Sequence, residues 1–256
     1  MALIFEKKEK IACITLNRPE AMNALDLQTV SELSQALIEF RDDDGLWAAI
    51  ITGAGDKVFC AGADLKTLVP LMGDAKDKPW ILPPTILRGL ELWKPVVAAI
   101  NGLALGGGLE LALACDLRIA SERAMLGTPE VAIGVLPGWG GTQRLPRVIP
   151  RCKAAEILLL GRPIDAQEAY RIGLVNKVVP AAQLMQAAQE WASQLCEVGP
   201  LAARAIKEAM NRGVELTLEH GLKLEWQLEM GLFTSEDMQE GVKSFAEKRK
   251  PQFKAK

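Results

Sequence analysis

The chain has 256 residues, which is long for one domain and short for two, so we expect one core domain with an appended element. Hydrophobic residues make up 49% and charged residues 24%, a composition typical of a globular protein and not of a disordered or fibrous one. The formal net charge of -2 excludes an overall field that would attract nucleic acid or an anionic membrane.

The first part of the chain predicts a hairpin, a helix and a buried strand. Residues 3–5 and 11–16 are short apolar runs on either side of a charged turn, the pattern of a β-hairpin. Apolar residues at spacings of three and four from Leu27 to Phe40 predict a helix, with Asp26 in position to cap it. The apolar run 48–52 predicts a strand buried on both faces. The same pattern recurs at 96–100 and 174–179, which indicates an α/β fold.

A strand predicted at residues 58–60 runs into the small residues 61–63, and Asp64 stands where a helix would start. Such a turn can present a nest of free backbone amides, although an ordinary strand-to-helix turn has the same pattern. Residues 68–84 follow as the least regular stretch, with three prolines and Trp80. We expect a mobile loop over a pocket there.

The segment 101–110 joins a buried strand to an apolar helix through Gly106, Gly107 and Gly108. Bare backbone at a helix N-terminus presents N–H groups to an oxygen and lets a ligand approach closely. The spacing matches neither the dinucleotide fingerprint nor the phosphate-binding loop of nucleotide hydrolases. Tight packing of helix against strand is the structural alternative. Two such amide sites in one domain favour a paired oxyanion hole.

Two acids stand in apolar surroundings. Glu110 falls in the first turn of the helix after the glycines, and Glu130 follows Thr128 and Pro129 and precedes an apolar run. Desolvation would raise the pKa of each carboxyl group towards neutrality, as a general acid or base requires. A capping or salt-bridged carboxylate is the alternative for each.

Other kinds of site find little support in the sequence. The single histidine, His220, lies in a charged helical tail, which argues against a Ser-His-Asp relay and a His-rich metal site. The odd number of cysteines, without a CxxC pair, predicts reduced, buried thiols in the cytosol. No segment has the pattern of an export signal or a membrane span, so we expect neither. The cysteines are Cys13, Cys60, Cys115, Cys152 and Cys196.

Several motifs in one order along the whole chain resemble the crotonase superfamily and, within it, the enoyl-CoA hydratases. They are Leu16-Asn17-Arg18-Pro19, Asn23-Ala24-Leu25, Ala61-Gly62-Ala63-Asp64, the segment from Asn101 to Glu110, Pro129-Glu130, Pro137-Gly138, the run from Gly140 to Leu145, and the terminal Glu247-Lys248-Arg249-Lys250.

The resemblance implies that the N–H groups of Ala63 and Gly107 form an oxyanion hole for a thioester carbonyl, and that Glu110 and Glu130 are the two acids of a hydratase. The pair would hold one water, with Glu110 assisting its addition to Cβ and Glu130 delivering a proton to Cα. No metal or cofactor is implied, since coenzyme A is part of the substrate. A Δ3,Δ2-enoyl-CoA isomerase and a specialised hydroxyacyl-CoA dehydratase are the alternatives.

The resemblance also implies substrate contacts outside the catalytic pair. Loop residues would hold the adenine and pantetheine portions of coenzyme A. Lys66 and the basic terminal run Lys248-Arg249-Lys250, the latter supplied by a neighbouring subunit, would meet its phosphates. A solvated charged face is the alternative for the lysines. Glu20 departs from the lysine that family members often carry there, which speaks against a phosphate contact at that position. The implied contacts are Ala21, Met22, Ala61, Asp64, Leu65, Lys66, Gly106, Pro129, Gly138 and Lys248.

By the same resemblance, residues 1–199 form a spiral of ββα units and residues 200–256 form a helical region that builds trimers or hexamers. Apolar spacing in the tail suits such an interface and equally suits an intramolecular core. Trp80 and Trp139 put bulk near the expected acyl site, which favours a short-chain substrate such as crotonyl-CoA or a flat ring. Some relatives are RNA-binding proteins, but the near-neutral charge and the lack of a basic and aromatic patch argue against that role.

Overall fold

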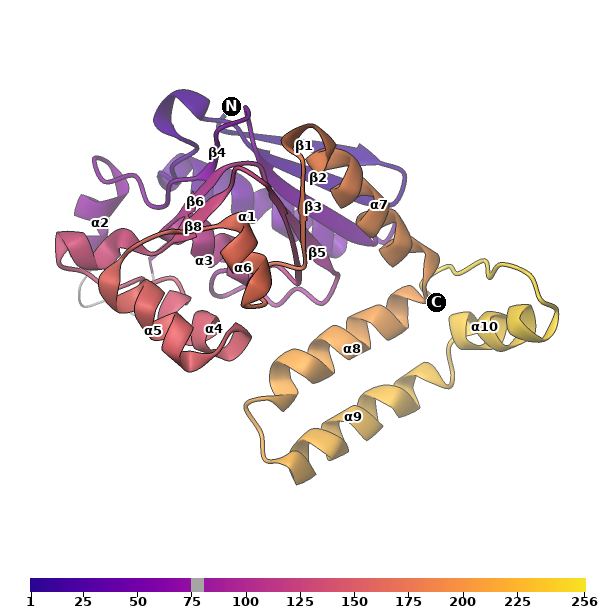
Figure 1. Cartoon of the computed structure of the whole chain (residues 1–256). Coiled ribbons are helices and arrows are strands. Elements are labelled where there is room, and N and C mark those ends of the chain that lie inside the picture. Colours follow the sequence, from indigo (N-terminus) through magenta and orange to yellow (C-terminus); the bar gives the residue numbers. More distant parts are fainter. Residues whose placement is uncertain (75–80) are drawn as a thin grey trace.

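The computed structural model describes residues 1–74 and 81–256, and its body is built on two sheets (Figure 1). The larger sheet has six strands. β1 and β2 form the expected antiparallel hairpin, and every other neighbouring pair is parallel. The strand order is β1 (Leu3–Lys8), β2 (Ile11–Leu16), β3 (Ala48–Gly53), β5 (Val96–Ile100), β7 (Leu117–Ser121) and β10 (Lys177–Val179).

The smaller sheet has four short strands, and the loops that follow three of them carry the candidate site residues. Its first three strands are parallel neighbours, and the fourth is antiparallel to the third. Because the chain passes from a strand of the large sheet to one of the small sheet and then to a helix, the ββα spiral expected from the resemblance is confirmed. The strands, in order, are β4 (Val58–Cys60), β6 (Leu103–Leu105), β8 (Met125–Gly127) and β9 (Ile164–Asp165).

The buried core accounts for the apolar runs and spacings that predicted strands and helices in the sequence. Strands β3 and β5 are buried along their whole length, as their continuous apolar runs predicted. Helix α1 (Leu27–Asp42) buries Val30, Leu33, Leu37 and Phe40, while Leu27 at its start is 44% exposed. The Asp26 carboxylate accepts a hydrogen bond from the Thr29 amide at 2.7 Å, so the expected cap is present. Helix α7 (Leu184–Glu197) packs against β3, β5 and β7.

One buried asparagine holds together the bends between the sheets. The Asn101 amide donates hydrogen bonds to the carbonyl oxygens of Gly53, Gly55 and Val58, at distances from 2.9 to 3.2 Å. A side chain at Gly102 would overlap the carbonyl group of Lys57, so the two bends can approach closely only with glycine there. These contacts fix β4 beside β6 and therefore fix the loops that follow them.

Three expectations about strands, helices and loops need correction. The strand predicted at 174–179 is limited to β10, because Leu174 and Val175 are buried in the turn that precedes it. Helix α2 begins at Leu68 and ends at Asp74, so Asp64 lies in the turn before it and not at its start. The mobile loop expected at 68–84 therefore includes α2, and Trp80, with the rest of residues 75–80, lies outside the described residues.

Shorter helices complete the body. Their ends fall at glycine or at extended residues in most cases, as at Gly161 after α5. They are α3 (Gly107–Ala114), α4 (Gly141–Val148), α5 (Arg151–Leu160) and α6 (Ala166–Arg171), with 3-10 turns η1 (Pro19–Ala21), η2 (Pro129–Ile133) and η3 (Ala181–Gln183).

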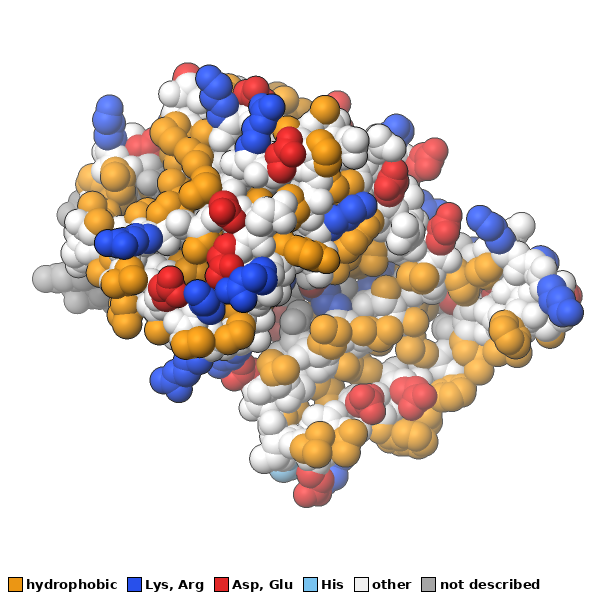
Figure 2. All heavy atoms as spheres, in the orientation of Figure 1, with side chains coloured by type: hydrophobic (Ala, Val, Ile, Leu, Met, Phe, Trp, Pro, Cys, Tyr) orange, Lys and Arg blue, Asp and Glu red, His pale blue; other side chains and the backbone are white. Residues whose placement is uncertain are grey.

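The last three helices form an arm that projects from the body (Figure 1). The Lys207 ammonium group ties the arm to the body through the Asp116 carboxylate at 2.7 Å and the Lys94 carbonyl oxygen at 2.9 Å. Hydrophobic side chains gather along α8 and α9 (Figure 2), and exposed ones include Leu218, Leu222 and Trp226. The arm helices are α8 (Pro200–Gly213), α9 (Leu218–Leu232) and α10 (Glu236–Ala246).

All five cysteines are free thiols. Cys60 and Cys115 are buried, but Cys152 is exposed, so the expectation of burial is wrong for that residue. None of the helices in the described ranges has the length and hydrophobicity to cross a membrane.

Candidate active site

The candidate site lies where three parallel strands of the small sheet end. Ala63 follows the end of β4 by three residues, Gly107 follows β6 by two, and Glu130 follows β8 by three. Neighbouring parallel strands lie about 4.8 Å apart, so the loops that leave their carboxyl ends lie side by side. The topology therefore brings these three residues to one edge of the sheet.

Two backbone amides face the same space. A Cβ atom placed on Gly107 would lie 3.4 Å from the Ala63 nitrogen, and one placed on Gly62 would lie 2.9 Å from the Gly107 nitrogen. Gly107 is the first residue of α3, so its N–H has no partner within the helix. Neither amide donates a hydrogen bond to another residue in the described ranges. This pair is suited to hold an oxygen that gains negative charge.

Glu110 lies in the first turn of α3, three residues after Gly107, and is 2% exposed. Its Oε1 accepts hydrogen bonds from the amides of Trp139 and Gly141, both at 2.7 Å. Burial raises the pKa of Glu110 to about 7, and the charge of Glu130 adds to the rise, while the two amides and Arg144 oppose it. The carboxyl group can therefore exchange a proton near neutral pH.

Glu130 approaches the site from η2. A Cβ atom on Gly106 would lie 2.7 Å from Glu130 Oε1, so the carboxyl group lies over bare backbone next to Gly107. Glu130 Oε2 is buried and makes no hydrogen bond with a described residue. Burial raises the pKa of Glu130 as well. Burying a polar oxygen without a hydrogen-bond partner costs free energy, so Glu130 Oε2 is suited to bind a ligand or a water molecule.

Trp139 closes one side of the site. Its side chain is buried, and two of its ring carbons lie 2.7 Å from the position of a Cβ atom on Gly107. The same residue also lines a cleft of about 530 Å³, together with Gly138, which is exposed, and Leu136. The ring thus stands beside the paired amides and limits what can lie against them.

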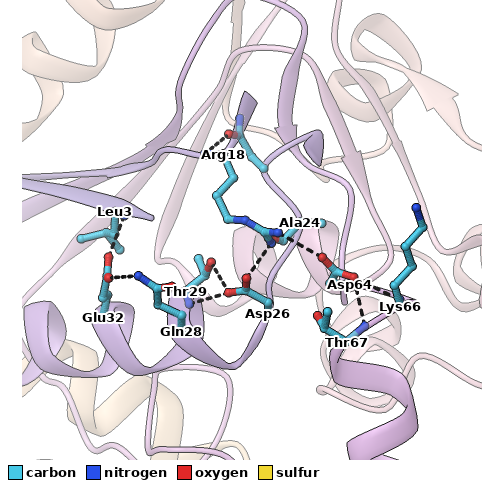
Figure 3. A network of polar contacts seen from close by, with 11 residues as sticks. Leu3, Arg18, Ala24, Asp26, Gln28, Thr29, Glu32, Asp64, Lys66 and Thr67 are labelled. Carbon is cyan, nitrogen blue, oxygen red and sulfur yellow. Dashed lines mark hydrogen bonds and ion pairs between the residues drawn. The ribbon is translucent and has the colours of Figure 1, made fainter. Parts of the chain in front are cut away.

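The loops expected to hold coenzyme A do lie beside the paired amides. The Ala61 amide donates to the Met22 carbonyl oxygen at 3.1 Å, which places the Ala21–Met22 turn against this segment. Figure 3 shows Arg18 between two carboxylates, Asp26 at 3.1 Å and Asp64 at 3.2 Å. Asp64 also accepts hydrogen bonds from the Lys66 and Thr67 amides, so it is committed to the loop's own structure.

The other residues expected to contact the substrate differ in their position relative to Glu130 and the paired amides. Leu65 and Lys66 are exposed, and the Lys66 side chain points away from the carboxylate network (Figure 3). Pro129 and Gly106 adjoin Glu130. Lys248 comes two residues after α10, which belongs to the projecting arm (Figure 1).

Sequence reasoning missed the amides of Trp139 and Gly141, which hold Glu110 directly, and the guanidinium of Arg144, which holds the Trp139 carbonyl oxygen. The Gly140-Gly141 pair was a signal of bare backbone, but its partner lies about thirty residues away in the sequence. His220 is exposed, and its ring nitrogen lies 2.8 Å from the Thr217 hydroxyl. Within residues 1–74 and 81–256, no three His, Cys, Asp or Glu side chains are grouped to hold a metal ion.

The matching family model, the related sequences and a solved structure all point to one family of proteins. The sequence model of the family described as Enoyl-CoA hydratase/isomerase matches residues 6–256. A short-chain-enoyl-CoA hydratase of Clostridium acetobutylicum is 43% identical over 249 residues, 97% of this chain and 95% of that protein. An (E)-benzylidenesuccinyl-CoA hydratase of Thauera aromatica is 42% identical over 99% of both chains. The crystal structure of an enoyl-CoA hydratase from Bacillus anthracis superposes with a TM-score of 0.92 at 40% identity, with 100% of both chains covered.

Proposed function

This chain belongs to the enoyl-CoA hydratase/isomerase family, and from that premise we propose that it is an enoyl-CoA hydratase, which adds water reversibly to a trans-2-enoyl-CoA. The supporting observation is the joint presence of two buried carboxyl groups with raised pKa beside a pair of free backbone amides. A hydro-lyase of this kind needs both parts, because water must be activated while charge collects on the thioester oxygen.

The proposed mechanism assigns each group one task. The thioester carbonyl oxygen accepts hydrogen bonds from the Ala63 and Gly107 amides, which stabilise the enolate as it forms. Glu110 and Glu130 hold one water molecule between them. Glu110 takes a proton as the water oxygen bonds to Cβ, and Glu130 delivers a proton to Cα on the same face, so the addition is syn. With a pKa of about 7, Glu110 has both protonation states available near neutral pH.

The alternatives use the same amide pair in different ways. A Δ3,Δ2-enoyl-CoA isomerase would move a proton between two carbons and needs one acid. The two glutamates would then differ greatly in their contribution to turnover. A hydroxyacyl-CoA dehydratase would run the proposed reaction in the opposite direction with the same groups.

The acyl group is proposed to be short or flat, since the ring of Trp139 lies against Gly107 and would obstruct a long chain. Crotonyl-CoA is the simplest such substrate. We expect no cofactor beyond the coenzyme A of the substrate itself. The contacts of Ala21, Met22, Ala61 and Leu65 with the coenzyme remain proposals that rest on the position of these loops.

We further propose that residues 200–256 mediate self-association into trimers or hexamers. The exposed apolar side chains along the arm support this, because they would gain stability from a neighbouring subunit. Association would also bring Lys248 of one subunit towards the coenzyme A phosphates of another. A cytoplasmic location is proposed as well, supported by five free cysteine thiols.

The decisive experiment follows the absorbance of the enoyl thioester after purified protein is mixed with crotonyl-CoA. Wild-type protein should consume it, and Glu110→Gln and Glu130→Gln should each lower kcat by about 10²- to 10⁴-fold. Glu122→Gln, which changes an exposed carboxylate, is the matched control and should keep wild-type activity. A large loss in only one of the two active-site variants would favour isomerisation. Absence of hydration by the wild type would overturn the proposal for this substrate.

A further inference from the structure

Arg144 is a half-buried cation whose guanidinium group donates hydrogen bonds to backbone carbonyl oxygens. From α4 its Nη1 donates to the Trp139 carbonyl oxygen at 2.9 Å, and its Nη2 donates to those of Leu87 at 2.9 Å and Ile86 at 3.3 Å. No carboxylate in the described ranges lies within 4.0 Å of the guanidinium nitrogens. A side chain at Gly140 would overlap Nη1, so the loop lies directly against the guanidinium group.

The loop that Arg144 holds is the one that supplies both hydrogen bonds to Glu110. Trp139 donates its amide to Glu110 Oε1 and offers its carbonyl oxygen to Arg144, so this residue is fixed from two sides. Gly141 donates the second amide at 2.7 Å. With Oε1 occupied in this way, Oε2 is the oxygen left for water. Arg144 reaches Glu110 through one residue of the backbone and does not touch the reacting atoms.

The charges around Glu110 give Arg144 a second influence. From η2, the charge of Glu130 raises the pKa of Glu110, and from α4 the charge of Arg144 lowers it. On β4, the backbone and Cβ atom of Cys60 lie against Gly108, and burial raises the pKa of the Cys60 thiol to about 12, so the thiol is uncharged at neutral pH. Strand β6 carries no titratable side chain. Among these neighbours, Arg144 supplies the positive charge.

We propose that Arg144 is a positioning residue for Glu110: it fixes the Trp139–Gly141 loop so that both amides stay on Oε1 and Oε2 stays turned to the substrate water. This inference rests on the proposed role of Glu110. It predicts that the position of Glu110 depends on the forked shape of the Arg144 guanidinium group. It also predicts that the protonation state of Glu110 depends on the positive charge of Arg144.

The test compares Arg144→Gln, Arg144→Lys and the control Arg147→Gln, which lies on the same helix at an exposed position. Crotonyl-CoA hydration is measured from pH 5.5 to pH 9. Arg144→Gln should lower kcat by about 10- to 100-fold with KM changed less than about threefold, because displacement of a catalytic group by a fraction of an ångström affects turnover more than binding. The pH at which kcat falls on the acid side should rise by roughly 0.5 to 1 unit. Arg144→Lys should also lose kcat but keep the wild-type pH dependence.

A second readout does not require turnover. With ¹³C-labelled glutamate side chains, the Glu110 resonance is the one missing from Glu110→Gln, and its titration midpoint should rise in Arg144→Gln but not in Arg144→Lys or Arg147→Gln. An unmoved midpoint in Arg144→Gln would overturn the inference, as would wild-type kcat in that variant. If the wild type does not hydrate crotonyl-CoA, the proposed function fails for that substrate, while the titration still decides the position and charge effect of Arg144.

Discussion

Replacing Glu110 by glutamine should make the folded protein more stable at alkaline pH while it removes activity. The ordinary pKa of a glutamate is 4.5 and that of Glu110 is about 7, so the folded state binds this proton more tightly than the unfolded state. The side chain is 2% exposed, so solvent screens the effect little. At about 1.4 kcal/mol per pKa unit, ionising Glu110 in the fold costs roughly 3 kcal/mol.

The sign follows from proton linkage. The contribution of Glu110 to the free energy of unfolding is present in full below pH 4.5 and is lost as the pH rises through about 7. Between pH 5 and pH 8, the wild-type protein should therefore lose about 2 to 3 kcal/mol that Glu110→Gln does not lose. The variant keeps an amide oxygen to accept from Trp139 and Gly141, and any weakening of those bonds is the same at both pH values.

Urea unfolding of wild type, Glu110→Gln and the control Glu122→Gln at pH 5 and pH 8 measures this difference. The protein concentration must be held constant, since the proposed self-association would stabilise the folded state by mass action. Glu122→Gln should follow the wild-type pH dependence. Equal pH dependence of wild type and Glu110→Gln would refute the view that burial of an ionisable Glu110 costs stability.

Three further predictions follow from the same geometry. Gly107→Ala would place a methyl group 2.7 Å from Trp139 ring carbons and 3.4 Å from the Ala63 amide, so kcat for crotonyl-CoA should fall by about 10²- to 10³-fold; a variant with full activity and an unchanged circular dichroism spectrum would contradict this. Trp139→Ala removes the ring but keeps the amide on Glu110, so the ratio of kcat/KM for decenoyl-CoA to that for crotonyl-CoA should rise by about tenfold or more, since one methylene is worth about 1–3 kcal/mol in an apolar site; an unchanged ratio would exclude the ring as the limit on chain length. Lys207→Met breaks the ion pair with Asp116 and should lower the free energy of unfolding by about 2 kcal/mol in urea titrations, with Lys223→Met on an exposed pair as the control that should change it little.

Local patterns carried most of the fold. The runs at β3 and β5 were predicted with nearly their observed bounds, because a strand buried on both faces must be apolar at every position. The cap at Asp26 was predicted because its partner is three residues away. The run at 174–179 was predicted too long, since a buried turn and a buried strand can share one composition. Leu174 and Val175 meet the core without extended pairing.

The candidate site likewise has parts that local sequence indicated and parts that depend on contacts between distant residues. Small residues after two strands indicated two turns with free backbone amides, and the family resemblance implied Ala63 and Gly107 as the donors. The structure brings the Ala63 and Gly107 nitrogens to one place, and their roles stay predictions until activity is measured. The amides of Trp139 and Gly141 reach Glu110 across 29 and 31 residues, and Arg144 reaches Leu87 across 57. No periodicity or spacing records such distances, because folding alone determines them.

The paired amides have a consequence for how this scaffold can diverge. They belong to the main chain, and every residue except proline supplies the same N–H group. A single amino-acid replacement at Ala63 can therefore crowd this donor but, proline apart, cannot delete it. Glu110 and Glu130, by contrast, are side chains that one codon change can erase. If the amides act as proposed, descendants of such a gene would keep the capacity to stabilise a thioester enolate, while replacements at two positions would change the reaction that the enolate undergoes.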